Sequence, residues 1–150
     1  MTIDLATLCR ETWCRLEPIA RVEAAFDSMA AAITGDLDPA LRIAFRSALD
    51  ARERVTTTAL GGGIAIPHAR MPGLAACRLG LGSFPAGLDM PSRDGARVDL
   101  LAVLLTREED HSEHLRLLAA VASRFADRHR RERLRRAAGP AELRATFIDG

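Results

Sequence analysis

Lysine is missing from this chain of 150 residues, and all 21 basic residues are arginine. Without a lysine amine the protein cannot form a Schiff base or use the lysine of a P-loop, so both kinds of chemistry are excluded. The net charge is only +1, because 20 acidic residues nearly balance the arginines. No overall field therefore favours nucleic acid or an acidic membrane, and any partner must be recognised through local features.

Long apolar runs and paired cysteines are also missing. No stretch approaches the roughly 18 apolar residues of a membrane-spanning helix, and the first residues, "MTIDLATLCRETWC", do not read as a signal peptide or an anchor. Cys9, Cys14 and Cys77 are odd in number and form no CxxC pair, which fits a reducing compartment. We expect a soluble, cytoplasmic protein with no membrane span.

The length and the apolar content suit one domain. With 48% hydrophobic residues the chain can bury one core, and it is too short for two domains of ordinary size. Apolar residues at helical spacing predict a helix over residues 18–34, which Gly35 would end. A second helix is predicted to start at Asp38 and Pro39, a side-chain cap followed by a first-turn proline, and to finish near Arg52.

Three strands are predicted after these helices. The short run "IAI" at residues 64–66 should end at Pro67, and residues 77–84 alternate as a strand does. The continuous apolar run 98–106 is typical of a central strand that is covered on both faces. With further helices after it, the order of elements predicts an α/β fold with a mixed central β-sheet and helices on both faces.

The first of those later helices should begin at Asp110. Glu113 stands three residues on, where it could complete a capping box. An arginine-rich helix and a last helix from Pro140 should follow. The inward-facing residues of the first of them are expected to be Leu118, Val121 and Phe125.

The stretch "TTTALGGGIAIPHAR", residues 56–70, is the candidate functional segment. Pro67 should end its strand and leave His68 projecting at the strand's end. The three glycines before it permit close approach of a ligand, and their amides could face an anion. Neither GxGxxG nor P-loop spacing is present, so no dinucleotide or nucleoside triphosphate is indicated. The alternative is a flexible glycine turn beside an ordinary surface histidine.

Three more histidines bear on the chemistry. His111 and His114 lie three residues apart at a predicted helix start, where amides and the helix dipole favour an anion. Together with His68 they could instead bind a metal, but no clear carboxylate or cysteine completes the set, so we predict none. His129 lies in "RHRRERLRR". That run could bind nucleic acid or an acidic partner. No aromatic residues lie among its arginines, so we predict a solvated helix face and no nucleic-acid binding.

The segments "ARERVTTTALGGGIAIPHAR" and "EHLRLLAAVASRFAD" resemble the IIA domains of the fructose and mannitol class in the bacterial phosphoenolpyruvate-dependent phosphotransferase system. The likeness to stand-alone nitrogen-regulatory IIA proteins is greatest, and it implies one IIA domain of the second type over residues 1–150. The resemblance implies that His68 carries a phosphoryl group and that His114 is the second histidine of the site. It also implies that Arg52, Thr57 and Thr58 help to bind the phosphoryl group.

This resemblance implies a phosphocarrier that needs no metal ion or cofactor. Its donor would be a small histidine phosphocarrier protein, and its output would be nitrogen or metabolic regulation through target proteins. One alternative is a sugar-specific IIA component that passes the phosphoryl group to a IIB partner, and another is an interaction module that is never phosphorylated. Thr56 and Ala59 stand where glycine is common in the family. If either backbone needed a positive φ, the loop would be strained.

Overall fold

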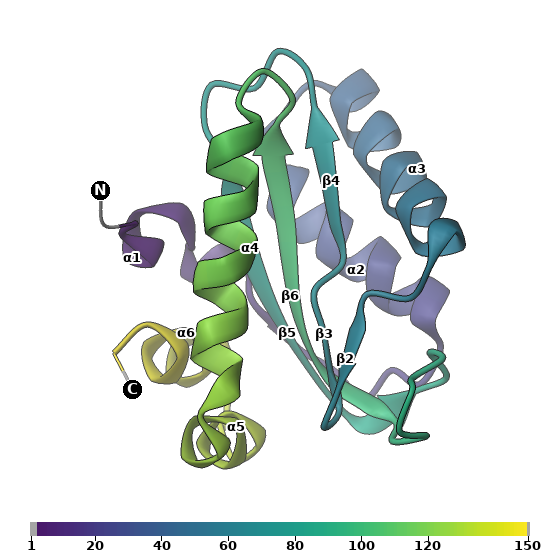
Figure 1. The fold of residues 1–150 in the computed structure, drawn as a ribbon, viewed down its shortest axis with the longest axis vertical. Helices are drawn as coiled ribbons and strands as arrows, with labels where there is room; N and C mark the ends of the chain where they lie inside the picture. The colour runs from purple at the N-terminus through teal and green to yellow at the C-terminus, as the bar shows by residue number, and fades with distance from the viewer. Residues whose placement is uncertain (1–2, 150) are drawn as a thin grey trace.

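The computed structural model describes residues 3–149. One mixed sheet forms its centre, with α2 and α3 on one face and α4 on the other (Figure 1). The elements in chain order are α1 Leu5–Leu8, a 3-10 turn Glu11–Trp13, β1 Arg15–Leu16, α2 Val22–Thr34, α3 Pro39–Val55, β2 Ala59–Gly61, β3 Ile64–Ala65, β4 His68–Met71, β5 Arg78–Leu88, β6 Val98–Arg107, α4 His111–Ala126, α5 Arg128–Arg135 and α6 Pro140–Asp149.

Strand β6 is the centre of the sheet. It pairs antiparallel with β5 on one side and parallel with β3 and β4 on the other, in the order β1-β5-β6-β3-β2 with β4 also on β6. Its side chains alternate between two cores. Leu101, Val103 and Leu105 pack with α2 and α3, whereas Leu100, Ala102 and Leu104 pack with α4, α5 and α6. The predicted central strand and the predicted α/β fold with helices on both faces are therefore confirmed.

Strands β3 and β4 are two parts of one path along β6, separated by Ile66 and Pro67. Ile64 is opposite Leu100, and after the break His68 is opposite Leu104. Pro67 has no N–H to donate to the ladder, but its carbonyl oxygen still accepts from the Leu104 amide at 3.0 Å. The expectation that His68 follows the end of the sheet strand was therefore wrong in detail, because His68 begins a second strand segment.

Two helix predictions need correction at their N-terminal ends. Helix α2 begins at Val22 rather than at residue 18, because the Asp89 carboxylate accepts the Val22 amide at 2.8 Å and caps the helix from a distant loop. Asp110 caps α4 by accepting the Glu113 amide at 2.9 Å. The Glu113 carboxylate does not return to the cap as a capping box requires, but binds Arg107 at 3.0 Å.

The buried stripe of α4 also differs from the prediction. Leu117, Val121 and Phe125 are buried, with His114 one turn before them. Leu118 is only partly buried, and it lines the pocket described below. The short elements α1, β1 and β2 were not predicted, since two to four residues give too little periodicity to read. Within residues 3–149 no helix is long and apolar enough to cross a bilayer.

Candidate functional site

His68 begins β4 directly after Pro67, and its two ring nitrogens have different surroundings. Nδ1 lies 2.8 Å from the Ile66 carbonyl oxygen. A carbonyl oxygen can only accept, so Nδ1 carries the hydrogen and Nε2 of the neutral ring carries the lone pair. The Arg52 Nε–H donates to this Nε2 at 3.2 Å. One nitrogen is therefore fixed by the backbone, and the other is presented as a base or nucleophile beside a guanidinium group.

The surroundings keep the His68 ring neutral. Burial lowers its pKa from the ordinary value, because the charged form loses solvation, and the positive charge of Arg52 acts in the same direction. The Ile66 carbonyl and the Glu53 carboxylate oppose this shift but do not reverse it. At neutral pH the Nε2 lone pair is therefore unprotonated, which a nucleophile requires.

His114 lies close to His68, although the two come from different elements. The ring centroids of the pair, one in α4 and one in β4, are 5.3 Å apart. His114 is only 6% exposed, and its Nδ1 lies 2.6 Å from the hydroxyl of Thr106 on β6. Burial first, and then the titratable ring of His68 and the positive charge of Arg70, lower its pKa to about 4. The fold thus brings together the two histidines that the sequence singled out, both neutral at pH 7.

A cavity of about 430 Å³ opens beside His68. Its walls come from the end of α3, the loop before β2, the loop between β5 and β6, and α4. The residues that line it include Arg52, Thr57, Thr58, His68, Arg93 and Leu118. The predicted nucleophile His68 and the cation of Arg52 therefore line the same cavity, which also has a partly apolar wall.

Thr57 and Thr58 line this cavity, but both hydroxyl hydrogens are already donated within the protein. Thr57 donates to the Pro91 carbonyl oxygen at 2.8 Å. Thr58 donates to Glu53 at 2.7 Å through its hydroxyl and at 2.9 Å through its amide. Either hydroxyl would have to leave its present acceptor to bind a phosphoryl oxygen. In this structure the two threonines hold the loop in shape.

The three glycines lie elsewhere than expected. Gly61, Gly62 and Gly63 have φ angles of 90°, 66° and 81° and form the turn between β2 and β3, and none of them lines the His68 cavity. The Gly62 amide donates to the Asp94 carboxylate at 2.8 Å. The Gly62 amide therefore does face an anion, but the anion is a side chain of the protein itself, and the three glycines form no cradle beside His68.

The two departures from the family pattern do not strain the loop. Thr56 has a φ of −166°, which is ordinary extended backbone. Ala59 lies in β2, and within residues 3–149 only glycines have a positive φ.

Sequence reasoning missed Arg93 and Thr106. Arg93 lies on the loop between β5 and β6 and reaches the His68 cavity. Its neighbour Asp94 ties that loop to the glycine turn, so the turn helps to place a second arginine near the site. Arg93 lies between two predicted strands, in a segment where the sequence shows no functional motif. Thr106 is part of the apolar run of β6, and a single threonine there gave no reason to expect a contact with His114.

His111, His114 and His129 do not line the His68 cavity. His111 is exposed and stacks on His114 with a centroid distance of 6.3 Å. His129 is exposed on α5, in agreement with the predicted solvated face. Several arginines of that run serve the fold: Arg130 and Arg131 donate to carbonyls at the end of α4, and Arg135 pairs with Asp99 at 2.8 Å. Across residues 3–149 no three histidine, cysteine or acidic side chains could hold a metal ion together.

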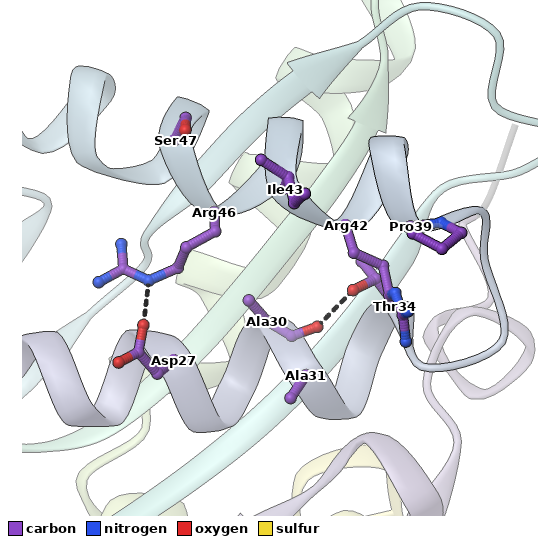
Figure 2. A pocket seen from close by; sticks show the side chains of 9 residues that line it. All are labelled: Asp27, Ala30, Ala31, Thr34, Pro39, Arg42, Ile43, Arg46 and Ser47. Atoms are coloured by element: carbon purple, nitrogen blue, oxygen red, sulfur yellow. Dashed lines mark hydrogen bonds and ion pairs between the residues drawn. The ribbon is translucent and has the colours of Figure 1, made fainter.

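A second cavity, of about 480 Å³, lies between α2 and α3 (Figure 2). Its lining is mostly apolar, with Ile43 exposed on one side. The Arg46 guanidinium donates to Asp27 across it at 2.7 Å. This cavity contains neither a histidine nor a cysteine.

Comparisons with known proteins identify the family of this chain. A sequence model of the family described as "Phosphoenolpyruvate-dependent sugar phosphotransferase system, EIIA 2" matches residues 13–149. A nitrogen regulatory protein of Pseudomonas aeruginosa is 40% identical over 101 residues, which are 67% of this chain and 66% of that protein. The chain thus spans just under two thirds of the length of this curated relative.

Solved structures share the fold. The crystal structure of the nitrogen regulatory protein IIA-Ntr from Neisseria meningitidis has a TM-score of 0.83 and 25% identity, covering 94% of this chain and 97% of that chain. In the complex of enzyme IIAMTL and phosphorylated enzyme IIBMTL from Escherichia coli, one chain matches with a TM-score of 0.72 and 18% identity. That match covers 95% of this chain and 100% of the other, and it shows the fold alone.

Proposed function

Because the chain belongs to the EIIA 2 family of the phosphoenolpyruvate-dependent sugar phosphotransferase system, we propose that it is a phosphocarrier that accepts a phosphoryl group on Nε2 of His68. One observation carries the proposal. The Nδ1–H of His68 is held by the Ile66 carbonyl at 2.8 Å, which leaves the Nε2 lone pair beside Arg52 at the cavity. This is the arrangement that a histidine nucleophile needs.

The transfer forms one bond and breaks one. The Nε2 lone pair of His68 bonds to phosphorus while the bond between phosphorus and the donor's histidine nitrogen breaks, and that nitrogen recovers its lone pair. His68 keeps its Nδ1 hydrogen throughout. The Ile66 carbonyl oxygen then faces the positive charge that the ring gains, which favours the phosphorylated state.

Two neighbours stabilise the phosphoryl oxygens. The Arg52 guanidinium already lies 3.2 Å from Nε2, so a small movement moves its donors from the nitrogen to the oxygens. A guanidinium group suits this task because it is always charged and presents several donors. His114, whose ring centre is 5.3 Å from that of His68, contributes a ring N–H to the same oxygens. Positioning and charge stabilisation of this kind require no metal ion or cofactor.

The proposed donor is a histidine phosphocarrier protein, and exposed apolar side chains near the site support the binding of a protein. Leu60 lines the cavity and is 59% exposed. Val55 precedes the cavity residue Thr56, and Leu115 follows His114, and both side chains are also more than half exposed. Exposed apolar side chains around a polar site are typical of a surface that binds another protein. The donor would present its own phosphohistidine to His68 across this apolar rim.

Two functions are possible, and they differ in the protein that responds to or receives the phosphoryl group of His68. The likeness to nitrogen regulatory proteins supports a regulatory output in the cytoplasm, in which target proteins read the phosphorylation state of His68. The alternative is a sugar-specific IIA component, which the likeness to a fructose-specific EIIABC component of Bacillus subtilis, 32% identical over 108 residues, supports. Transfer of the phosphoryl group from this protein to purified IIB components separates the two, since only the alternative predicts rapid transfer.

The proposal is tested by intact-protein mass after incubation with phosphoenolpyruvate, the general first enzyme of the system and a histidine phosphocarrier protein. We expect one added phosphoryl group that is lost in acid and is absent from His68→Ala. His129→Gln is the matched control, because His129 is exposed on α5 outside the cavity, and it should label like the wild type. If the wild type gains no mass from an active donor, the protein is an interaction module and not a phosphocarrier.

A further inference from the structure

The hydroxyl of Thr106 lies between two acceptors and has one hydrogen to give. Thr106 is fully buried on β6. Its Oγ1 lies 2.6 Å from Nδ1 of His114 and 3.4 Å from the Ala69 carbonyl oxygen. Hydroxyl hydrogen bonds to oxygen are usually 2.5–3.0 Å long, so the contact with Ala69 is weak and the contact with His114 is strong.

Two arrangements of hydrogens are possible at this contact, and they have opposite consequences for His114. If the hydroxyl donates to Nδ1, the single hydrogen of the neutral imidazole must lie on Nε2. If the hydroxyl donates to Ala69 instead, Nδ1–H donates to the hydroxyl and Nε2 carries a lone pair. The first arrangement offers an N–H to a phosphoryl oxygen, whereas the second turns a lone pair toward a negative group.

We infer that Thr106 is a positioning residue for phosphoryl transfer, because its hydroxyl donates to Nδ1 of His114 and holds the ring hydrogen on Nε2, where it can be donated to a phosphoryl group on His68. This inference rests on the proposed function. The distances support it directly, since the 2.6 Å contact is the shorter of the two by 0.8 Å. A buried hydroxyl in this place has no solvent to compete for its hydrogen.

A doubly protonated His114 would donate from both nitrogens, but its surroundings oppose this form. Burial is the first cause, and the charged or titratable groups that face the ring from neighbouring elements act in the same direction. Together they lower the pKa of His114 to about 4. Those groups are His68 and Arg70 on β4, His111 on α4 and Arg52 on α3. At neutral pH the ring therefore has one hydrogen, and the bond to Thr106 decides which nitrogen holds it.

Two substitutions of Thr106 distinguish the effect of losing the hydroxyl from the effect of changing the shape of the side chain. Thr106→Val has nearly the same volume without a hydroxyl, and Thr106→Ser keeps the hydroxyl. The primary measurement is the ¹⁵N chemical shifts of the His114 ring in the unphosphorylated protein, which report the tautomer and need no phosphoryl transfer. The second measurement is the rate of phosphorylation by a histidine phosphocarrier protein.

We expect the Nε2–H tautomer of His114 in the wild type and in Thr106→Ser. In Thr106→Val this preference should be lost, and phosphorylation should slow by about tenfold, the effect of one hydrogen bond to a charged group. A wild-type ring with its hydrogen on Nδ1 would overturn the inference, and so would an unchanged tautomer or an unchanged rate in a folded Thr106→Val protein. If Thr106→Val does not fold, the tautomers of the wild type and Thr106→Ser decide.

The two proposals fail in different ways. If the wild type is never phosphorylated by an active donor, the proposed function is wrong and the role of Thr106 in transfer is lost with it. If the wild type is phosphorylated and Thr106→Val is phosphorylated equally fast, only the inference about Thr106 is wrong.

Discussion

Acid should destabilise this protein through His114 more than through an ordinary histidine. The ring is buried, and in the folded state its pKa is lowered to about 4, whereas an unfolded histidine has a pKa of about 6.5. As the pH falls below about 6.5, the unfolded chain binds a proton at this position and the folded chain does not. The free energy of unfolding therefore decreases as the pH falls toward the folded-state pKa.

The size of the effect follows from the two pKa values. Between about pH 7.5 and pH 5, the difference in proton binding lowers the free energy of unfolding by about 2 kcal/mol. Other groups also titrate in this range, so the prediction concerns a comparison. His114→Gln has no titrating ring, and its free energy of unfolding should fall by about 2 kcal/mol less than that of the wild type over the same pH interval.

Urea unfolding at several pH values, followed by circular dichroism, measures both proteins under the same conditions. An NMR titration of the His114 ring in the folded wild type gives an independent value of its pKa. Equal acid sensitivity of the two proteins, or a folded-state pKa near 6.5, would refute the reasoning from burial. His129→Gln serves as the control, because this exposed histidine should contribute no such difference.

Two further substitutions test the site and its support. In Arg52→Gln, phosphorylation of His68 should slow by about tenfold to a hundredfold, since a charged donor beside the phosphoryl oxygens is removed; stopped-flow transfer measures the rate, and an NMR titration should show the pKa of His68 rising. In Gly63→Ala, a Cβ at a φ of +81° would strain the backbone and would lie 2.6 Å from Arg135 and 2.7 Å from Asp99, so the ion pair of these side chains must shift and thermal unfolding should show a loss of about 2 kcal/mol. Gly95→Ala, which has a positive φ but no atom within 4 Å of the new Cβ, should lose less, and equal losses would contradict the steric argument. A normal rate in Arg52→Gln would remove Arg52 from the mechanism.

The parts of the fold that could be predicted depend on residues close together in the chain. The cap at Asp38, with Pro39 in the first turn, marked the start of α3, and the Asp38 carboxylate does accept the Ala40 amide at 2.8 Å. The largely apolar run of β6 predicted a strand with two covered faces, which its alternation between two cores confirms. Signals of this kind can be read from the sequence alone, because helix caps and side-chain periodicity act over a few residues.

The start of α2 and the place of the glycine turn could not be predicted in the same way. The residue that caps α2 at Val22 is Asp89, which lies 67 residues along the chain. The partner of the Gly62 amide is Asp94, which lies 32 residues away. Neither carboxylate can be assigned to its amide before the pairing of the strands is known. The sequence contains many acidic residues, and it does not show the register in which the strands pair.

The sequence alone determined the longer helices and strands, the alternation of layers and the choice of His68 as the candidate histidine, because each follows from local composition, spacing or resemblance. Only the tertiary structure decided which nitrogen of His68 is presented, since that depends on the Ile66 carbonyl contacting Nδ1 and on Arg52 contacting Nε2. The tertiary structure also decided that Thr106 contacts His114, through the packing of α4 on β6. The distances between side chains on separate elements are fixed only when the sheet and its covering helices pack together.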